Sequence, residues 1–274
     1  ARQEMAGHRG RRMVNVSGEE VYPLTQADQE TEPSEEAVEI NLSECVEPLR
    51  ITEGGEYVLS GTLYDSLIID VKDQLVHLFL NGCTIRSGSG PALNIFSAGK
   101  VIITLVEGTE STVRDSQNYH NYDIYSAAIS APCDLTINGT GSLFAYGFYK
   151  DAIKSQDILK INGGTYFIQA KRDGLRGNDG LVLAPEKMTV ETERNGLTTT
   201  KSQKRGKGDM DIRSGEIMVT SGKYAVSCSA DLYLRTQDLK TVSVYGDYEI
   251  QGRTFDLREE GQGQQGQEAA SEEG

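Results

Sequence analysis

The chain has 274 residues and a formal net charge of −14, from 41 acidic and 27 basic residues. This length suits one large domain, and the charge disfavours nucleic acids and anionic membranes as general partners. The sequence has no apolar run long enough to cross a bilayer, so we expect no membrane span.

The two ends of the chain differ from its middle. Residues 1–36 are polar and mixed in charge, with few apolar side chains to anchor a core, and we expect a flexible leader. Residues 259–274 consist largely of Gly, Gln and Glu, and we expect a disordered acidic tail. Residues 37–258 between them form the expected folded domain. No signal peptide is visible, and a first residue other than Met is compatible with a mature or trimmed chain.

Short runs of alternating apolar and polar residues mark the expected strands. They occur at 38–42, 57–59, 67–69, 76–80, 101–105 and 135–139, and Gly, Asn and Asp are frequent in the turns between them. His77 lies where the alternation points outward, so we expect it to be a surface residue rather than a ligand.

Residues 151–197 indicate an all-β fold with a fixed repeat. Asp151, Asp173 and Asn195 recur every 22 residues, and Leu159 and Leu181 repeat at the same offset. A period of this length is typical of a solenoid, and stacked β coils of this size form a parallel β-helix. We expect about seven coils.

Two segments interrupt the pattern. Residues 201–209 form a basic insertion, and residues 115–125 carry three tyrosines among Asn and His. A loop that leaves a solenoid on one face is often a binding site. We therefore name Tyr119, Tyr122 and Tyr125 as candidate binding residues. Tyr149, which follows Tyr146 and Phe148, is a further candidate, although this second set fits packing at a coil corner equally well.

Residues one period apart in a β-helix stack about one strand spacing, roughly 4.8 Å, from each other. The repeat therefore predicts two ladders of oxygen ligands, with Lys154 and Arg176 in a row between them. Stacked carboxylates repel, and calcium, which takes about six to eight oxygen ligands, would remove that cost. The candidate ligands are Asp151, Asp157, Asp173, Asn178, Asp179 and Asn195.

The repeated Asp and Asn residues also have an explanation that does not involve calcium. Asp-Gly and Asn-Gly are common turn dipeptides because Asp, Asn and Gly tolerate left-handed backbone, and a solenoid repeats its turns anyway. The repeated second acidic position, at Asp157 and Asp179, favours calcium. A transition metal is not expected, because no His lies nearby and no Cys pair has zinc spacing. The cysteines either form disulfides, in one of three pairings, or fill positions in the stack: Cys45, Cys83, Cys133 and Cys228.

Residues 51–235 resemble a family of bacterial extracellular carbohydrate-binding domains. The matching stretches are ITEGGEYVLSGTL (51–63), VIITLVEGT (101–109), DLTINGTGSL (134–143), DAIKSQDILKINGGTY (151–166) and DGLRGNDGLVL (173–183). The resemblance implies a right-handed, single-stranded parallel β-helix related to the family-nine pectate lyases. It also implies a protein that is secreted or at the bacterial cell surface, binds plant-type polysaccharide and holds calcium. Asp151 and Asp173 match the family's repeated Asp-Gly-Ile turn, and Asp157 and Asp179 match the segment that follows; Ala152 stands where the family usually has Gly.

We expect an extracellular, non-catalytic polysaccharide-binding monomer. Lys154 and Arg176 would contact polygalacturonate, or the tyrosines would stack on a neutral β-glucan. Two alternatives stay open. A calcium-dependent pectate-type lyase would use Lys154 or Arg176 as the base that removes a proton beside a uronate carboxylate. A structural or adhesive surface protein would bind no sugar.

Overall fold

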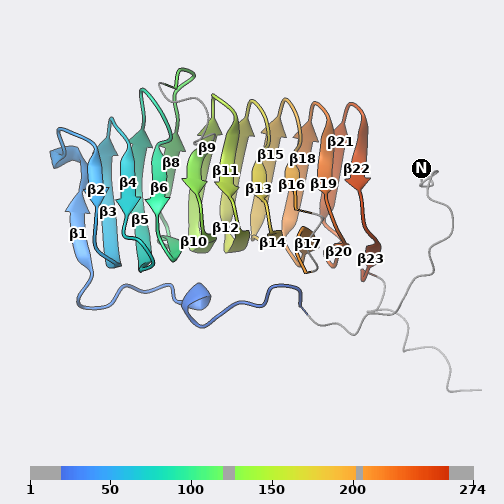
Figure 1. The fold of residues 1–274 in the computed structure, drawn as a ribbon, viewed down its shortest axis with the longest axis horizontal. Helices are drawn as coiled ribbons and strands as arrows, with labels where there is room; N and C mark the ends of the chain where they lie inside the picture. The colour runs from blue at the N-terminus through green and yellow to red at the C-terminus, as the bar shows by residue number, and fades with distance from the viewer. Residues whose placement is uncertain (1–19, 120–126, 202–205, 259–274) are drawn as a thin grey trace, which may run out of the picture.

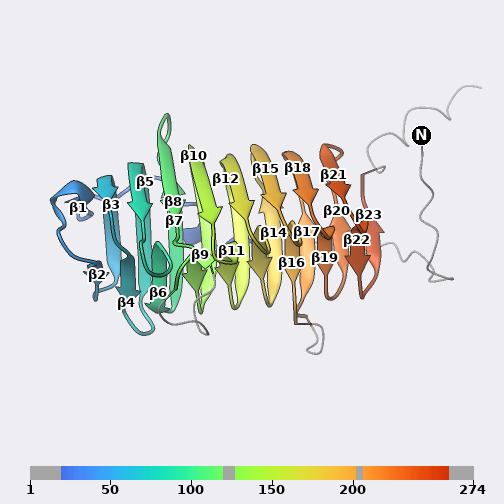
Figure 2. The ribbon, with the colours of Figure 1, turned by 90° about the horizontal axis from the view of Figure 1, so that it is seen from above.

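The computed structural model describes residues 20–119, 127–201 and 206–258. In these ranges the chain is almost entirely β, and its helical pieces are two short 3-10 helices, η1 (Ala27–Gln29) and η2 (Leu42–Glu44). The expectation of an all-β protein is confirmed. The strands lie side by side in an elongated stack, and the chain advances along it from β1 to β23 (Figures 1 and 2).

The strands pair in parallel within two sheets. The nine-stranded sheet contains, in order, β2 (Leu49–Ile51), β4 (Leu67–Asp70), β6 (Leu93–Ser97), β9 (Ala127–Ala131), β11 (Asp151–Ser155), β13 (Leu175–Gly177), β16 (Leu197–Thr199), β19 (Tyr224–Cys228) and β22 (Gly246–Ile250).

The main path of the 14-stranded sheet contains β1 (Val38–Asn41), β3 (Gly55–Leu63), β5 (Leu75–Arg86), β7 (Lys100–Leu105), β10 (Asp134–Gly147), β12 (Ile158–Ala170), β14 (Gly180–Ala184), β17 (Asp209–Ile212), β20 (Leu232–Leu234) and β23 (Thr254–Asp256). Four further strands branch from this path: β8 (Glu110–Arg114), β15 (Lys187–Thr192), β18 (Glu216–Ser221) and β21 (Leu239–Ser243).

The long strands of the 14-stranded sheet bend, so three columns of strands run along the stack. The first column contains β7, β14 and β17 with the N-terminal halves of β5, β10 and β12. The second contains β8, β15, β18 and β21 with the C-terminal halves of the same long strands. The nine-stranded sheet is the third column. Gly139 forms the bend in β10: its φ is 93°, and a Cβ there would lie 2.3 Å from the Leu105 carbonyl oxygen, so the bend requires glycine.

Residues 22 apart stack as the sequence predicts. Ile153 pairs with Leu175, which pairs with Leu197, and all three side chains are completely buried. The row continues to Ile129 on one side and to Val226 on the other. One aliphatic ladder therefore lines the interior of the third column, and each repeat buries its apolar side chains against its neighbours.

The expected count of about seven coils is wrong, because the nine-stranded sheet supplies nine repeats in the described part of the chain. The sequence pattern misses the first repeats because their spacing is irregular. Leu49, Leu67 and Leu93 share one row of the sheet but are unevenly spaced along the chain. Longer connections are tolerated as long as each strand keeps its partner, because the entropy cost of a loop rises slowly with its length.

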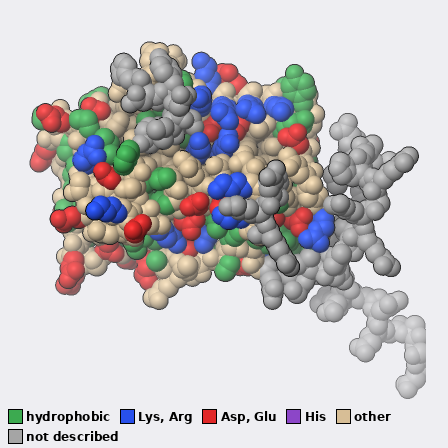
Figure 3. Space-filling view, viewed as in Figure 1, with side chains coloured by type: hydrophobic (Ala, Val, Ile, Leu, Met, Phe, Trp, Pro, Cys, Tyr) green, Lys and Arg blue, Asp and Glu red, His purple; other side chains and the backbone are tan. Residues whose placement is uncertain are grey.

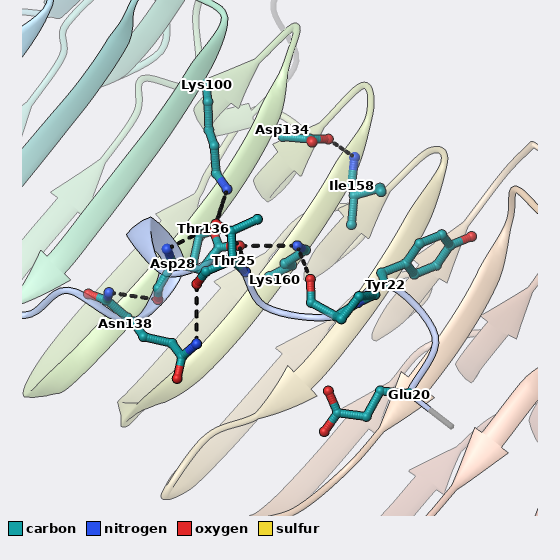
Figure 4. A network of polar contacts seen from close by, with 12 residues as sticks. Glu20, Tyr22, Thr25, Asp28, Lys100, Asp134, Thr136, Asn138, Ile158 and Lys160 are labelled. Carbon is teal, nitrogen blue, oxygen red and sulfur yellow. Dashed lines mark hydrogen bonds and ion pairs between the residues drawn. The ribbon is translucent and has the colours of Figure 1, made fainter. Parts of the chain in front are cut away.

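Residues 20–36, which the sequence places in the leader, form an N-terminal strap against the outer face of the first column (Figures 1 and 4). Asp28 is completely buried, and Lys160 Nζ lies 3.2 Å from its Oδ2. Tyr22 Oη donates to the Asp179 carbonyl at 2.9 Å, and Arg213 Nη2 donates to the Val21 carbonyl at 2.6 Å. The strap is thus tied to several successive repeats. Residues 1–19 and 259–274 lie outside the described residues.

His77 is not a surface residue, contrary to expectation. Its side chain is only 4% exposed, and its Nε2 lies 2.7 Å from Thr104 Oγ1. Thr104 Oγ1 donates to Asn138, whose Nδ2 donates to the strap carbonyl of Asp28 at 3.0 Å. The strap therefore covers this outward face, so the alternation predicts the direction of the side chain but not its burial.

In the pairs Asp173-Gly174 and Asn195-Gly196, the glycine allows close packing between neighbouring repeats. Neither Gly174 nor Gly196 is among the glycines with positive φ. A Cβ on Gly196 would lie 2.1 Å from Val219 Cγ1 and 2.7 Å from the Ala225 carbonyl oxygen. Close packing between repeats therefore explains the glycine at these two positions, and a left-handed turn does not.

The four cysteines are unpaired, and Cys83, Cys133 and Cys228 are buried, so these three fill positions in the stack. Within the described ranges, no helix has the length and apolar character needed to cross a bilayer.

Candidate functional site

The Asp151 ladder consists of Asp151, Asp173 and Asn195, which occupy equivalent places in successive repeats of the third column. The Asp173 N–H donates to Asp151 Oδ1 at 3.2 Å, and the Asn195 N–H donates to Asp173 Oδ1 at 3.4 Å. All three residues are at most 4% exposed. Each carboxylate therefore accepts a backbone amide of the next repeat, which gives the repeated aspartates a structural role.

Two arginines offset the negative charge of the Asp151 ladder. Arg172 Nε lies 3.5 Å from Asp151 Oδ1 and 3.9 Å from Asp173 Oδ2, and Arg176 Nη1 lies 3.4 Å from Asp173 Oδ2. Burial and the nearby Asp173 carboxylate raise the pKa of Asp151, and the two guanidinium groups oppose this shift. Cations of the chain itself thus offset part of the repulsion between the stacked carboxylates.

A row of basic residues follows the corner between the second and third columns. The Arg172 N–H donates to the Lys150 carbonyl at 2.8 Å, the Arg194 N–H to the Arg172 carbonyl at 3.2 Å, and the Lys223 N–H to the Arg194 carbonyl at 2.8 Å. These backbone bonds place one cation in each of four successive repeats.

Lys154 and Arg176 pair beside this row, on β11 and β13. We call the combined set the basic stripe: Lys150, Lys154, Arg172, Arg176, Arg194 and Lys223. Lys and Arg side chains gather in the upper part of the face shown in Figure 3. The chain as a whole carries a charge of −14, so the basic stripe reverses the sign of the charge locally.

Lys154 has an altered acidity. The residue is half-buried, and burial lowers its pKa; Arg176, Arg172 and Lys150 lower it further, whereas Asp151 opposes the shift. Neighbouring cations disfavour the charged form of an amine, and a lysine with a lowered pKa is neutral, and so available to accept a proton, at a lower pH than usual.

The second predicted ladder lies after β11. The Asp179 N–H donates to the Asp157 carbonyl at 3.0 Å, so these two residues are also in register. Lys201 Nζ lies 2.6 Å from Asp179 Oδ1, and Lys207 contacts Oδ2. Burial would raise the pKa of Asp179, but hydrogen bonds from the two lysines lower it overall. Lysines of the basic insertion therefore already satisfy this carboxylate.

The Asp151 ladder retains oxygen atoms that suit a hard cation. Asp151 Oδ2 and Asn195 Oδ1 are buried, with no hydrogen-bond partner in the described chain. Asn178 fits less well, because its Oδ1 accepts from Arg176 Nε at 3.0 Å and from Thr200 Oγ1 at 2.9 Å. The described residues contain no group of three His, Cys, Asp or Glu arranged to hold a metal. A calcium ion at the Asp151 ladder would therefore need the amide oxygen of Asn195 as well as carboxylates.

Tyr119 is placed for packing and offers no free ring face to a sugar. Its side chain is 1% exposed, its Oη donates to Asp115 Oδ2 at 2.7 Å, and its ring stacks on Tyr149 with the centroids 4.2 Å apart. Lys150 Nζ lies 4.9 Å from the Tyr149 ring centroid, so half-buried Tyr149 borders the basic stripe. Tyr122 and Tyr125 lie outside the described residues, and their role stays a prediction.

Comparison with known proteins decides the family. Residues 47–274 match the family model of carbohydrate-binding domain-containing proteins. The chain belongs to this family. Its N-terminal strap lies before the matched region, and the repeats that carry the Asp151 ladder and the basic stripe lie within it.

A carbohydrate-binding domain-containing protein of Acetivibrio thermocellus is 31% identical over 135 residues, which are 47% of this chain and 47% of the relative. The chain thus spans about half the length of that curated relative. Among solved structures, the polysaccharide lyase-like protein from C. thermocellum, in a gadolinium derivative, has a similar fold with a TM-score of 0.73. The two chains are 23% identical, and the match covers 80% of this chain and 95% of the other.

Sequence reasoning missed most of the basic stripe, although a signal was present. Lys150, Arg172 and Arg194 recur every 22 residues, as the Asp151 ladder does. A search for repeated cations at that period would have found them. Lys223 escapes such a search, because the 201–209 insertion precedes it and breaks the period.

Proposed function

We propose that the protein is an extracellular, non-catalytic polysaccharide-binding protein, and that the basic stripe binds an acidic polysaccharide such as polygalacturonate. The observation that carries this proposal is the stacking of one cation per repeat over four successive repeats. Strand spacing places these charges roughly 4.8 Å apart. A polymer with a carboxylate on each sugar can pair with several of them at once, by charge-assisted hydrogen bonds.

Family membership supports polysaccharide as the ligand class, and the local charge supports an acidic one. The net charge of −14 would repel a uronate polymer at long range. Close to the basic stripe the potential has the opposite sign, because the two ladder carboxylates beneath it are buried and paired with arginines. Binding is therefore expected to weaken as salt screens the cations.

The test replaces two cations without disturbing the buried ladder. Arg194→Gln with Lys223→Gln removes two charges of the basic stripe, and Lys187→Gln with Lys240→Gln removes two charges from the second column as a matched control. Affinity for polygalacturonate at low salt should fall about tenfold or more in the first variant and change less than about twofold in the control. Equal effects in both variants would mean that net charge alone governs binding. Absence of any sugar binding by the unmodified protein would favour a structural or adhesive role.

We include calcium in the proposal, at Asp151, Asp173 and Asn195. The support is the pair of buried oxygens without hydrogen-bond partners, Asp151 Oδ2 and Asn195 Oδ1. A bound ion would add positive charge beside the basic stripe and offer a ligand position to a uronate carboxylate. It would also compete with Arg172, which lies against two of the same carboxylates.

Melting curves with calcium and with excess chelator test the calcium part. Calcium that binds the folded form raises the melting temperature, and the shift should be larger in Arg172→Gln, in which the competing cation is gone. If neither protein shifts, the calcium part is wrong, while the role of the basic stripe in sugar binding is unaffected.

A second candidate function is a polysaccharide lyase, favoured by the lowered pKa of Lys154. In such a reaction the neutral Lys154 amine takes the proton beside a uronate carboxylate, the glycosidic oxygen leaves, and a carbon–carbon double bond forms in the sugar. The unsaturated product absorbs ultraviolet light, so incubation with polygalacturonate decides between the functions. Absorbance that rises with the unmodified protein but not with Lys154→Met would replace the binding proposal by the lyase.

We further propose that the stack is a right-handed, single-stranded parallel β-helix related to that of the family-nine pectate lyases, and that the protein acts as a monomer, secreted or at the bacterial cell surface. Parallel strands joined by crossover connections are right-handed in nearly all proteins, which supports the handedness. Polysaccharides of plant type lie outside bacterial cells, which supports the location. An experimental structure tests the handedness, and fractionation of the source cells tests the location.

A further inference from the structure

A cluster of aromatic side chains lies on the outer face of the second column. Phe144 and Tyr146 project from β10, Phe148 follows it, and Phe167 projects from β12, and all four are half-buried. The Tyr146 and Phe148 ring centroids are 5.8 Å apart with planes 13° from parallel. Phe167 lies 6.3 Å from Phe144 and 6.1 Å from Tyr146. We call these four residues the aromatic cluster.

The aromatic cluster borders a surface hollow with polar groups at its rim. The hollow has a volume of about 490 Å³, and three members of the cluster line it. Exposed Arg86, Glu110 and Arg114 line the rest, together with half-buried Thr112. Arg114 lies over the Phe148 ring, 5.1 Å from its centroid. The hollow therefore combines flat apolar faces with hydrogen-bond donors and an acceptor.

The other repeats show that the scaffold does not need aromatic residues here. In the register of the second column, Phe144 and Phe167 share a row with Thr84, Thr112, Thr189, Met218 and Lys240. Tyr146 shares the next row with Arg86, Arg114, Gln169, Glu191, Thr220 and Val242. Polar or β-branched residues thus serve most repeats, and the aromatic rings are confined to the two repeats beside the hollow.

We propose that the aromatic cluster and the hollow form a second glycan site, which binds a neutral chain of flat sugar rings. The C–H faces of such rings pack on aromatic faces, and their hydroxyl groups pair with charged and polar groups at the rim. Arg86 and Arg114 can donate hydrogen bonds to sugar hydroxyl groups and Glu110 can accept them, so the rim suits a chain rich in hydroxyl groups. This inference rests on the proposed function, since it assumes that the protein binds polysaccharide.

The test uses substitutions that the scaffold itself carries in neighbouring repeats. Phe144→Thr and Tyr146→Gln introduce the residue types of Thr112 and Gln169, so the backbone register has a precedent. Met218→Thr, in the same row as Phe144 but outside the hollow, is the matched control. Titration calorimetry measures the affinity for a soluble β-1,4-glucan oligosaccharide and, separately, for polygalacturonate.

We expect the double variant to bind the glucan about tenfold more weakly or worse, with polygalacturonate affinity changed less than about twofold. Retained polygalacturonate binding also shows that the variant is folded; if it unfolds, Tyr146→Gln alone is used. Undiminished glucan binding, an equal loss in Met218→Thr, or no glucan binding by the unmodified protein would each overturn the second site. Failure of the unmodified protein to bind either polymer would instead overturn the proposed function.

Discussion

The backbone N–H of Asp173 donates to the carboxylate of Asp151, one repeat earlier, at 3.2 Å. The same relationship links Asn195 to Asp173. A side chain of one repeat thus satisfies the backbone of the next, so the Asp151 ladder couples the folding of adjacent repeats. Its members are buried, and most of their charge is met by Arg172 and Arg176.

Replacing Asp151 by Ala should destabilise the protein by about 3 kcal/mol, because it leaves the buried Asp173 amide without its acceptor and removes the nearer of the two carboxylates that contact Arg172. Asp151→Asn keeps an oxygen acceptor, as Asn195 does naturally in this ladder, and should cost about 1 kcal/mol. Urea unfolding measures both free energies. Equal losses in the two variants would show that the amide hydrogen bond contributes little.

Asp28 anchors the N-terminal strap, and its removal should cost roughly 3 kcal/mol, because Lys160 would stay largely buried without its carboxylate partner. Asp28→Ala should also speed amide hydrogen exchange over residues 21–30, since the strap would detach locally. Glu216→Ala is the control: its ion pair with Lys187 is more than half exposed on both sides and should contribute less than about 1 kcal/mol. Similar losses of stability in both variants would mean that burial of the strap pair adds nothing.

Gly196→Ala should destabilise the stack by about 1–3 kcal/mol, because the added methyl would overlap Val219 and the Ala225 carbonyl of the next repeat. Gly90→Ala is the matched control, since a Cβ at Gly90 meets no atom within 4 Å. That control should change stability by less than about 0.5 kcal/mol. Thermal unfolding of both variants checks the difference, and a neutral Gly196→Ala would show that the repeats can shift to admit a methyl group.

Asp115 should make stability fall with rising pH. Burial raises its pKa from 3.8 to about 6, although hydrogen bonds from Tyr119 and from the Phe148 backbone oppose the shift. Between these two values the folded state holds a proton that the unfolded state has lost, so the free energy of unfolding decreases as pH rises, by at most about 3 kcal/mol.

Urea unfolding between about pH 4 and about pH 7 measures this effect for the unmodified protein and for Asp115→Asn, which cannot ionise. The stability difference between the two proteins should move in favour of Asp115→Asn as the pH rises. Asp73→Asn, at an exposed position, controls for the loss of one negative charge. A difference that does not vary with pH would contradict the raised pKa of Asp115.

The sequence by itself determined the repeat, the all-β character and the family resemblance. The reason is that a solenoid stacks residues one period apart, so the row that contains Ile153, Leu175 and Leu197 can be read from their spacing. The Asp151 ladder follows from the same rule, and so would the basic stripe at Lys150, Arg172 and Arg194. This rule fails where the period is irregular, as around Leu67 and Leu93. A count of repeats based on the period therefore gives about seven, two fewer than the nine in the structure.

Only the tertiary structure decided which outward faces are covered and which charges meet. Asp28 reaches Lys160 across 132 residues of chain, and no local pattern encodes a contact of that range. His77 is buried for the same reason, because the N-terminal strap lies over a face that strand alternation alone assigns to solvent. The pairing of Arg172 with both Asp151 and Asp173 likewise depends on how a corner side chain folds back onto the third column, which periodicity does not specify.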